Sequence, residues 1–433
     1  MPSEPRARGS LRLLAAASVA IFALTACVDG PSRPTTPTYS GNQRPNPTRP
    51  PRPGEPLPSA PVSTKFADSR NAYMPRHIPN GDRRELKRIA VMLPFTSPDP
   101  DVRKLANALF NAIQMSLFEV GAQDVVLMPR DSGTDAQSSG RAAQDAIKDG
   151  AIAVVGPLFA QQIPSVAQEA SRVGAPVFSF STDTSAIGGG AYLMSLTPQT
   201  EIDRIVDWAS TQGINRFAMF GPDTEYGHVA ETALNAAAAR HGAVVIDAEY
   251  YRPGDNSPQG PAKRLAERVK AEDKASPGKV AVLIPERGVQ LRTVASLLPY
   301  FDVNLRQVKF LGTGFWNDSA VWREPALFGG AFPAPDPNLI ADFDKRYQAT
   351  FGEPAPKLAS FGYDAGALAA ALAKGDRLDA AMVQRQEGFA GVNGLFRFLG
   401  DGSIQRALTV MQIEPGGGVK VVSPAVVAFS PGS

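Results

Sequence analysis

Short apolar runs alternate with amphipathic stretches along the chain from about residue 88 onward. Residues 89–93 read IAVML, which is apolar at every position and typical of a strand buried on both faces. Residues 102–120 follow with apolar side chains spaced as on one face of a helix. The same patterns predict strands at 125–128, 152–155, 175–178, 217–220, 244–246 and 280–284, and helices at 142–148, 202–210, 229–240 and 262–269.

Repeated strand–helix units predict parallel sheets covered by helices, and therefore an α/β fold. The chain has more predicted strands than one such sheet usually contains, so we expect two α/β lobes. Two further strands are predicted at 395–398 and 407–413, with Asp401 and Gly402 between them as a hairpin turn.

The first residues have the zones of an export signal. Three arginines (Arg6, Arg8 and Arg12) precede an apolar run at 13–24, which is shorter than the roughly 20 residues of a membrane-spanning helix. The run ends in LTAC at 24–27, which resembles the lipobox of bacterial lipoproteins. The resemblance implies a signal peptide at 1–26 and a lipid anchor in the bilayer at Cys27. A plain secretory signal with an incidental cysteine is the alternative.

Two observations bear on this anchor. Cys27 is the only cysteine of the chain, so an intramolecular disulfide is impossible, and acylation would remove a lone thiol. Val28 follows it, whereas an aspartate at that position would resemble the signal for retention in the inner membrane. In a Gram-negative host, the resemblance therefore favours the outer membrane, facing the periplasm, over the inner membrane.

Residues 27–86 are predicted to form a disordered tether. Eleven of the 31 residues from Pro31 to Pro61 are proline, a composition typical of extended polyproline II that could reach about 90 Å. Residues 28–90 carry eleven Lys and Arg against five Asp and Glu. A basic tether thus precedes an acidic body, in which nothing resembles a nucleic-acid-binding surface.

Several stretches together resemble the type I periplasmic binding proteins, typified by leucine-binding protein. They are RIAVMLP at 88–94, GAIAVVGP at 150–157, GAPVFS at 174–179, DTEYG at 223–227 and GYDA at 362–365. The resemblance implies two lobes of parallel sheet flanked by helices, with a ligand cleft between them, formed by residues 87–433. It places the first lobe at about 87–197 and 327–385 and the second at about 198–326 and 386–433.

The same resemblance implies candidate residues for the cleft. In amino-acid binders of the family, a serine after the third strand and hydroxyl groups after the fourth strand hold the ligand carboxylate. An acid in the second lobe meets the ligand ammonium. Here Ala160 replaces that serine, and a carboxylate at Asp183 would repel a ligand carboxylate. The cleft candidates are Phe159, Ser181, Thr182, Asp183, Tyr226, Glu286 and Arg287.

Two interpretations of these residues stay open. In one, Phe159 and Tyr226 line a pocket for a small-molecule ligand, with polar contacts from the others. In the other, Phe159 plugs the cleft and Ser181 caps a turn. The three histidines lack the spacing of metal ligands, so no metal site is expected. The sequence also lacks the motifs of nucleophilic or nucleotide-binding enzymes, so neither a cofactor nor enzymatic activity is expected. Asp364 is expected to pack or cap a helix rather than to catalyse.

Two functions are consistent with the sequence. The lipobox, the long tether and the altered carboxylate clamp resemble the penicillin-binding-protein activators, a subgroup of this fold that stimulates a peptidoglycan synthase. A penicillin-binding protein or peptidoglycan would then be the partner, although the helical-repeat domain of known activators has no counterpart here. The alternative is the solute-binding component of a branched-chain amino-acid ABC importer.

Overall fold

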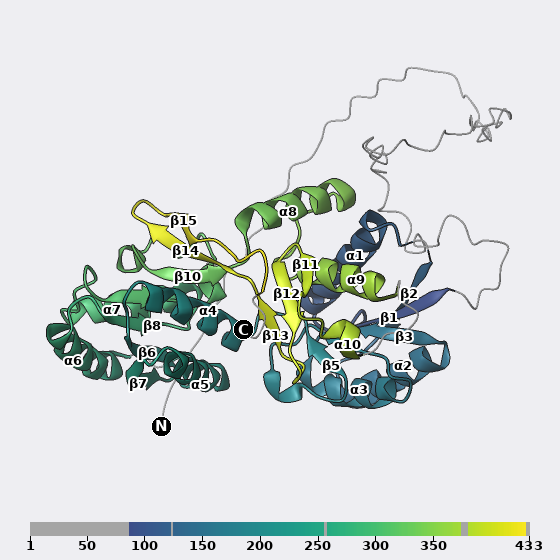
Figure 1. Ribbon diagram of the computed structural model, residues 1–433, viewed down its shortest axis with the longest axis horizontal. Helices are drawn as coiled ribbons and strands as arrows, with labels where there is room; N and C mark the ends of the chain where they lie inside the picture. Colours follow the sequence, from purple (N-terminus) through teal and green to yellow (C-terminus); the bar gives the residue numbers. More distant parts are fainter. Residues whose placement is uncertain (1–85, 123, 255–257, 374–379, 430–433) are drawn as a thin grey trace, which may run out of the picture. The chain divides into compact units, whose positions relative to one another are not determined.

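The computed structural model describes residues 86–122, 124–254, 258–373 and 380–429. The signal peptide, Cys27 and nearly all of the tether lie outside these residues. Within them, two largely parallel sheets flanked by helices form two lobes, so the predicted α/β fold class is confirmed (Figure 1).

The first lobe is built on five parallel strands in the order β2-β1-β3-β4-β5. Their bounds are Lys87–Leu93 (β1), Val125–Asp131 (β2), Ala151–Val155 (β3), Val177–Ser179 (β4) and Ala191–Leu193 (β5). The helices α2 (Ala136–Lys148) and α3 (Ile163–Ser171) cover one face of this sheet, and α1 (Pro100–Glu119) covers the other. The backbone amides of Asp101 and Val102 donate to the Asp99 side chain, which caps α1 at its start.

Gly156 directly follows β3, and its backbone lies against the backbone of Met92 in β1. A Cβ at this position would lie 2.0 Å from the carbonyl oxygen of Met92, and the φ angle of Gly156 is +107°. Both conditions require glycine, and they allow the chain to turn tightly at the carboxyl end of β3.

The second lobe is built on a seven-stranded sheet in the order β15-β14-β10-β9-β8-β6-β7. The strands from β10 to β7 are parallel, whereas β14 and β15 are antiparallel additions. Helices α4 and α5 pack on one face of it, and α6 and α7 pack on the other. The strands of this sheet are β6 (Arg216–Pro222), β7 (Val244–Tyr251), β8 (Val280–Leu283), β9 (Lys309–Leu311), β10 (Ala331–Ala334), β14 (Thr409–Glu414) and β15 (Gly418–Ser423). The helices are α4 (Pro198–Thr211), α5 (Glu225–Arg240), α6 (Gln259–Ala275) and α7 (Gly288–Tyr300).

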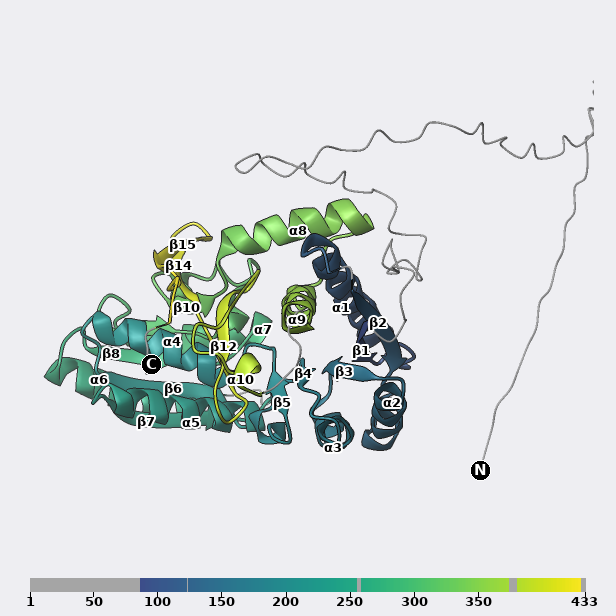
Figure 2. The same ribbon diagram turned by 45° about the vertical axis from the view of Figure 1, so that its right-hand side comes forward.

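The remaining elements complete the first lobe. Helix α9 (Ala359–Ala373) packs against α1, and α8 (Pro337–Phe351) also contacts α1 (Figure 2). A three-stranded antiparallel sheet contributes apolar side chains to the same core as α9. Its strands are β11 (Phe389–Gly391), β12 (Gly394–Phe398) and β13 (Ile404–Arg406), and α10 (Ala380–Val383) precedes them.

These placements differ from the predicted lobe boundaries. The chain was expected to rejoin the first lobe by residue 327, yet β10 pairs with β9 and β14 in the sheet of the second lobe. Residues 386–433 were expected in the second lobe; β14 and β15 do belong to its sheet, but Phe389, Phe396 and Phe398 lie in the core of the first lobe. An apolar run predicts a buried strand without indicating which sheet it joins, because both sheets bury the same residue types. The turn at Asp401 and Gly402 connects the antiparallel pair β12 and β13, whereas the predicted partner strand at 407–413 corresponds to β14 in the sheet of the second lobe.

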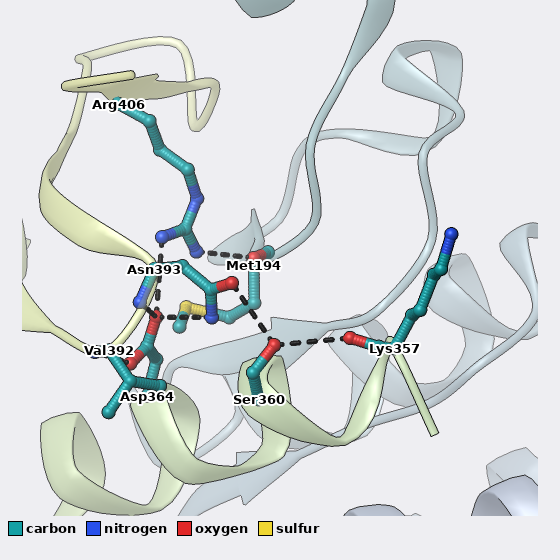
Figure 3. A network of polar contacts seen from close by, with 7 residues as sticks. All are labelled: Met194, Lys357, Ser360, Asp364, Val392, Asn393 and Arg406. Atoms are coloured by element: carbon teal, nitrogen blue, oxygen red, sulfur yellow. Dashed lines mark hydrogen bonds and ion pairs between the residues drawn. The ribbon is translucent and has the colours of Figure 1, made fainter. Parts of the chain in front are cut away.

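Asp364 links α9 to the three-stranded sheet, in agreement with the packing role predicted for it. Its carboxylate accepts hydrogen bonds from the backbone amides of Val392 and Asn393 and from the Asn393 side chain (Figure 3). Arg406 on β13 lies against the same carboxylate and donates to the carbonyl of Met194, 2.6 Å away. These contacts connect three separate segments of the chain, although Nε of Arg406 is buried without a hydrogen-bond partner among the described residues.

Candidate functional site

In the first lobe, two of the predicted residues, Ser181 and Asp183, lie in hydrogen-bonded turns at the carboxyl ends of the strands. The amide of Asp183 donates to Ser181 Oγ over 3.1 Å, so the hydroxyl oxygen of Ser181 stabilises a turn. Asp183 Oδ1 in turn accepts from the backbone and the hydroxyl of Ser185. Thr182 is exposed, and Phe159 is half-buried at the start of a short 3-10 turn, Ala160–Gln162.

Two other serine hydroxyls near this edge of the first sheet donate to backbone carbonyls. Ser179 Oγ donates to the carbonyl of Pro157 over 2.9 Å, and Ser195 Oγ donates to the carbonyl of Ser181. These two hydroxyl protons are therefore used within the fold. The hydroxyls of Ser181 and Thr182 donate to no group in the described part of the chain, so this edge keeps two neutral donors for a ligand.

The predicted residues of the second lobe converge at the carboxyl ends of three neighbouring strands. Tyr226 lies in the first turn of α5, after β6, and Glu286 and Arg287 follow β8. Thr313 and Phe315 follow β9, which is the next strand of the sheet. Because β6, β8 and β9 are parallel and adjacent, these segments meet at one edge of the sheet, where open α/β sheets bind ligands.

Contacts between side chains define a cluster at this edge, which we call the acid–aromatic cluster. The Tyr226 hydroxyl donates to Thr313 Oγ1 over 3.2 Å, and its ring lies 5.0 Å from the ring of Phe315. The guanidinium carbon of Arg287 lies 5.2 Å from the centre of the Phe315 ring, in a cation–π contact. The cluster comprises Glu201, Tyr226, Glu286, Arg287, Thr313, Gly314 and Phe315.

Glu286 is held within this cluster by its neighbours. The hydroxyl of Tyr251 donates to Glu286 Oε2, and the backbone amide of Arg287 donates to Glu286 Oε1 over 2.9 Å. Burial, and then the hydrogen bond to the carboxylate, raise the pKa of Tyr251. Both oxygens of Glu286 thus have protein partners.

Glu201 was not predicted, and it is the most buried acid of the cluster. It lies in the first turn of α4 and is 7% exposed, and the backbone amide of Gly314 donates to its Oε1 over 3.1 Å. Burial raises the pKa of Glu201 to about 8, and the hydrogen bond from Gly314 offsets only part of that rise. A Cβ at Gly314 would lie 2.3 Å from Glu201 Oε1, so glycine is needed for this approach.

Sequence reasoning missed Glu201 because its local pattern is ordinary. Thr197 caps α4, Pro198 follows, and an acid in the next residues is a common way to stabilise a helix start. Only the packing of α4 against the turn after β9 makes this acid part of the cluster. Burial of a carboxyl group beside a ligand-facing edge is, in turn, a feature of functional sites.

Comparisons with known proteins agree with this geometry. The family described as periplasmic binding protein matches residues 87–418, which is more than half of the chain. This chain belongs to the periplasmic binding protein family. No curated protein sequence matches it.

Solved structures of this family share the fold at low sequence identity. A protein assigned to a branched-chain amino acid ABC transporter of Rhodospirillum rubrum is 19% identical, with a TM-score of 0.66 over 78% of this chain and 100% of that one. An ABC transporter substrate-binding protein of Desulfitobacterium hafniense in complex with leucine is 20% identical, with a TM-score of 0.56 and coverage of 78% and 100%. A solute-binding protein of R. palustris in complex with benzoate is 15% identical, with a TM-score of 0.52 and coverage of 80% and 98%.

Two kinds of feature are absent from the described residues. No helix among them is both long and apolar enough to cross a membrane. Over the same part of the chain, no group of three or more His, Cys, Asp or Glu side chains is placed to hold a metal ion.

Proposed function

We propose that this protein is an exported, non-enzymatic solute-binding protein that binds a small molecule and presents it to an ABC importer. The observation that carries the proposal is the acid–aromatic cluster, which gathers rings and polar groups at the carboxyl ends of β6, β8 and β9. Ligand sites are typically built from a few polar groups among apolar and aromatic side chains. Proteins of the same fold hold leucine and benzoate, which supports a small organic ligand.

Ligand binding by the mature protein tests this proposal. A ligand that binds the folded state alone raises the free energy of unfolding by about 2.7 kcal/mol at a concentration of 100 Kd. Thermal melting of residues 28–433 should therefore rise with at least one compound in a library of amino acids, amines, aromatic acids and cell-wall fragments. A library in which no compound raises the melting temperature would contradict the proposal.

The export signal and Cys27 support a periplasmic location with a lipid anchor, and Val28 supports the outer membrane. A tether of up to about 90 Å is more than a receptor needs to reach a permease close to its own membrane. If the protein is anchored in the outer membrane, its domain would have to extend across part of the periplasm to reach an importer in the inner membrane. Fractionation of the two membranes tests the location directly.

A second candidate function is the activation of a peptidoglycan synthase. It is favoured by the first-lobe edge, where the hydroxyls of Ser179 and Ser195 are bonded to the backbone and Ala160 replaces a clamp serine. In that case, the tether would carry the domain through the cell wall to a penicillin-binding protein. Purified mature protein should then accelerate glycan polymerisation or crosslinking by a penicillin-binding protein of its host, and an unchanged rate would argue against this function.

A further inference from the structure

Glu201 has one carboxyl oxygen without a protein partner. Its Oε1 accepts the hydrogen bond from the Gly314 amide, while its Oε2 makes no hydrogen bond to any other group in the described part of the chain. The side chain is 7% exposed, and Oε2 is not one of the fully buried atoms that lack a hydrogen-bond partner, so this oxygen keeps some access to solvent. Glu201 therefore retains the capacity to accept one more group.

Both oxygens of the second acid of the cluster, by contrast, already accept a hydrogen bond within the protein. Glu286 is bonded through both oxygens, to the Tyr251 hydroxyl and to the Arg287 amide. Glu286 therefore positions the loop after β8, whereas Glu201 is the acid available to a ligand. Tyr226, on α5, lies close enough to Glu201 for that carboxylate to raise the tyrosine pKa, after the larger effect of burial.

The ring of Phe315 in the cluster already makes a contact with a cation. Arg287 places its guanidinium over Phe315, and Phe315 contacts Tyr226. Phe315 is 38% exposed, so part of its surface is open to solvent. An aromatic face next to a carboxyl group suits an ammonium or guanidinium group, which gains from both the ring and the acid.

The first-lobe edge supplies no positive charge to complement the carboxylate of an amino acid. The hydroxyls of Ser179 and Ser195 donate to backbone carbonyls, and Asp183 adds negative charge. The segments 156–160 and 180–183 also contain neither lysine nor arginine. A ligand carboxylate placed there would meet the charge of Asp183 with only the neutral hydroxyls of Ser181 and Thr182 as side-chain donors in these segments, and neutral donors are weaker partners than a cation.

We propose that the acid–aromatic cluster binds an organic amine or guanidine that has no carboxylate, with Glu201 as the residue that selects for the cation. The inference rests on the proposed ligand-binding function and narrows it to a substrate class. Binding of a cation stabilises the ionised form of Glu201. Since the empty site holds this acid mostly protonated near neutral pH, binding releases a proton, and affinity for the cation rises as the pH approaches 8.

Three probes of the same shape separate the chemical classes. They are 3-methylbutylamine, which carries only the cation, 4-methylpentanoate, which carries only the carboxylate, and L-leucine, which carries both. Titration calorimetry of the mature protein at pH 7 should detect binding of the amine at least tenfold tighter than that of leucine, and no binding of the carboxylate. Calorimetry in buffers of different ionisation enthalpy should show the release of up to one proton per amine bound.

The variant Glu201→Gln should lose at least tenfold in affinity for the amine and all of the proton release. Glu225→Gln is the matched control, because it removes the same charge from an exposed residue next to Tyr226. It should bind like the unmodified protein. If Glu201→Gln fails to fold, as judged by circular dichroism, Phe315→Ala tests the same cluster through a partly exposed residue and should weaken amine binding tenfold or more.

The outcomes separate the inference from the function on which it rests. Leucine or 4-methylpentanoate binding tighter than the amine, or amine binding without proton release, would overturn the inference and leave a solute-binding protein of another class. Failure of all three probes to bind would also overturn it. The wider function would fail only if the full compound library gave no ligand.

Discussion

The guanidinium group of Arg406 lies 3.4 Å from the carboxylate of Asp364, and neither side chain is exposed to solvent (Figure 3). The Arg406 guanidinium also lies between two rings, 4.8 Å from the centre of Phe396 and 5.2 Å from that of Phe361. This ion pair connects helix α9 to strand β13, which directly precedes the β14 strand of the second lobe. One buried contact therefore links two elements whose contacting residues lie 42 positions apart in the chain.

Replacing one member of this pair should destabilise the fold strongly. Asp364→Asn keeps the shape of the side chain but leaves the Arg406 charge buried and unpaired, which we expect to cost about 3–5 kcal/mol. The free energy of unfolding in urea measures this loss. Asp342→Asn is the matched control, since Asp342 pairs with Lys345 at the surface and its side chain is 70% exposed. A loss no larger than that of the control, which should stay below about 0.5 kcal/mol, would contradict this account of the pair.

The buried acid Glu201 should make stability depend on pH. Its pKa is raised to about 8 in the folded protein, so the folded state binds more protons than the unfolded state between about pH 4.5 and 8. Stability therefore falls as the pH rises through this window, with a contribution from this group of at most about 1.4 kcal/mol per pH unit. Urea unfolding at several pH values should give a shallower fall for Glu201→Gln than for the unmodified protein. Equal slopes for the two proteins would mean that Glu201 is ionised in the folded state.

Gly156 should not tolerate a side chain. In Gly156→Ala, the new Cβ would meet the carbonyl oxygen of Met92 at 2.0 Å in addition to the strain of a positive φ. Gly174→Ala isolates the strain, because Gly174 has a φ of +69° and no atom within 4 Å of its Cβ position. We expect a loss of about 1–2 kcal/mol for Gly174→Ala and a clearly larger loss for Gly156→Ala. Thermal or urea unfolding compares the two, and equal losses would show that the strands can shift to accept the methyl group.

Cys27 should determine whether the protein is bound to a membrane. Cys27→Ser removes the thiol that a lipid would modify, so the variant expressed in its host should take up no labelled palmitate and appear in the soluble periplasmic fraction. The unmodified protein should take up the label and sediment with membranes. Ser32→Ala, in the adjacent tether, serves as the control and should behave as the unmodified protein. Membrane association of Cys27→Ser would indicate another anchor.

Local patterns predicted many elements of the fold, although β5, β9, α7 and α8 were not predicted. The apolar runs at 89–93, 217–220 and 280–284 became buried strands, and the periodic stretch at 102–120 became α1. These predictions succeed because side-chain spacing reflects the period of each element. The predicted groups Tyr226, Glu286 and Arg287 also meet at one edge of a sheet, because they follow adjacent parallel strands.

Tertiary packing decided the rest. Whether Ala331–Ala334 joins one sheet or the other depends on pairing with β9 and β14, which are distant in sequence from each other. The placement of Glu201 against Gly314, and of Arg406 against Asp364, likewise depends on contacts between segments separated by 113 and 42 residues. The sequence by itself determined where many of the strands and helices lie, because propensity and periodicity are local. Only the tertiary structure decided which acids are buried and which charges are paired, because burial and electrostatic pairing arise from contacts between distant parts of the chain.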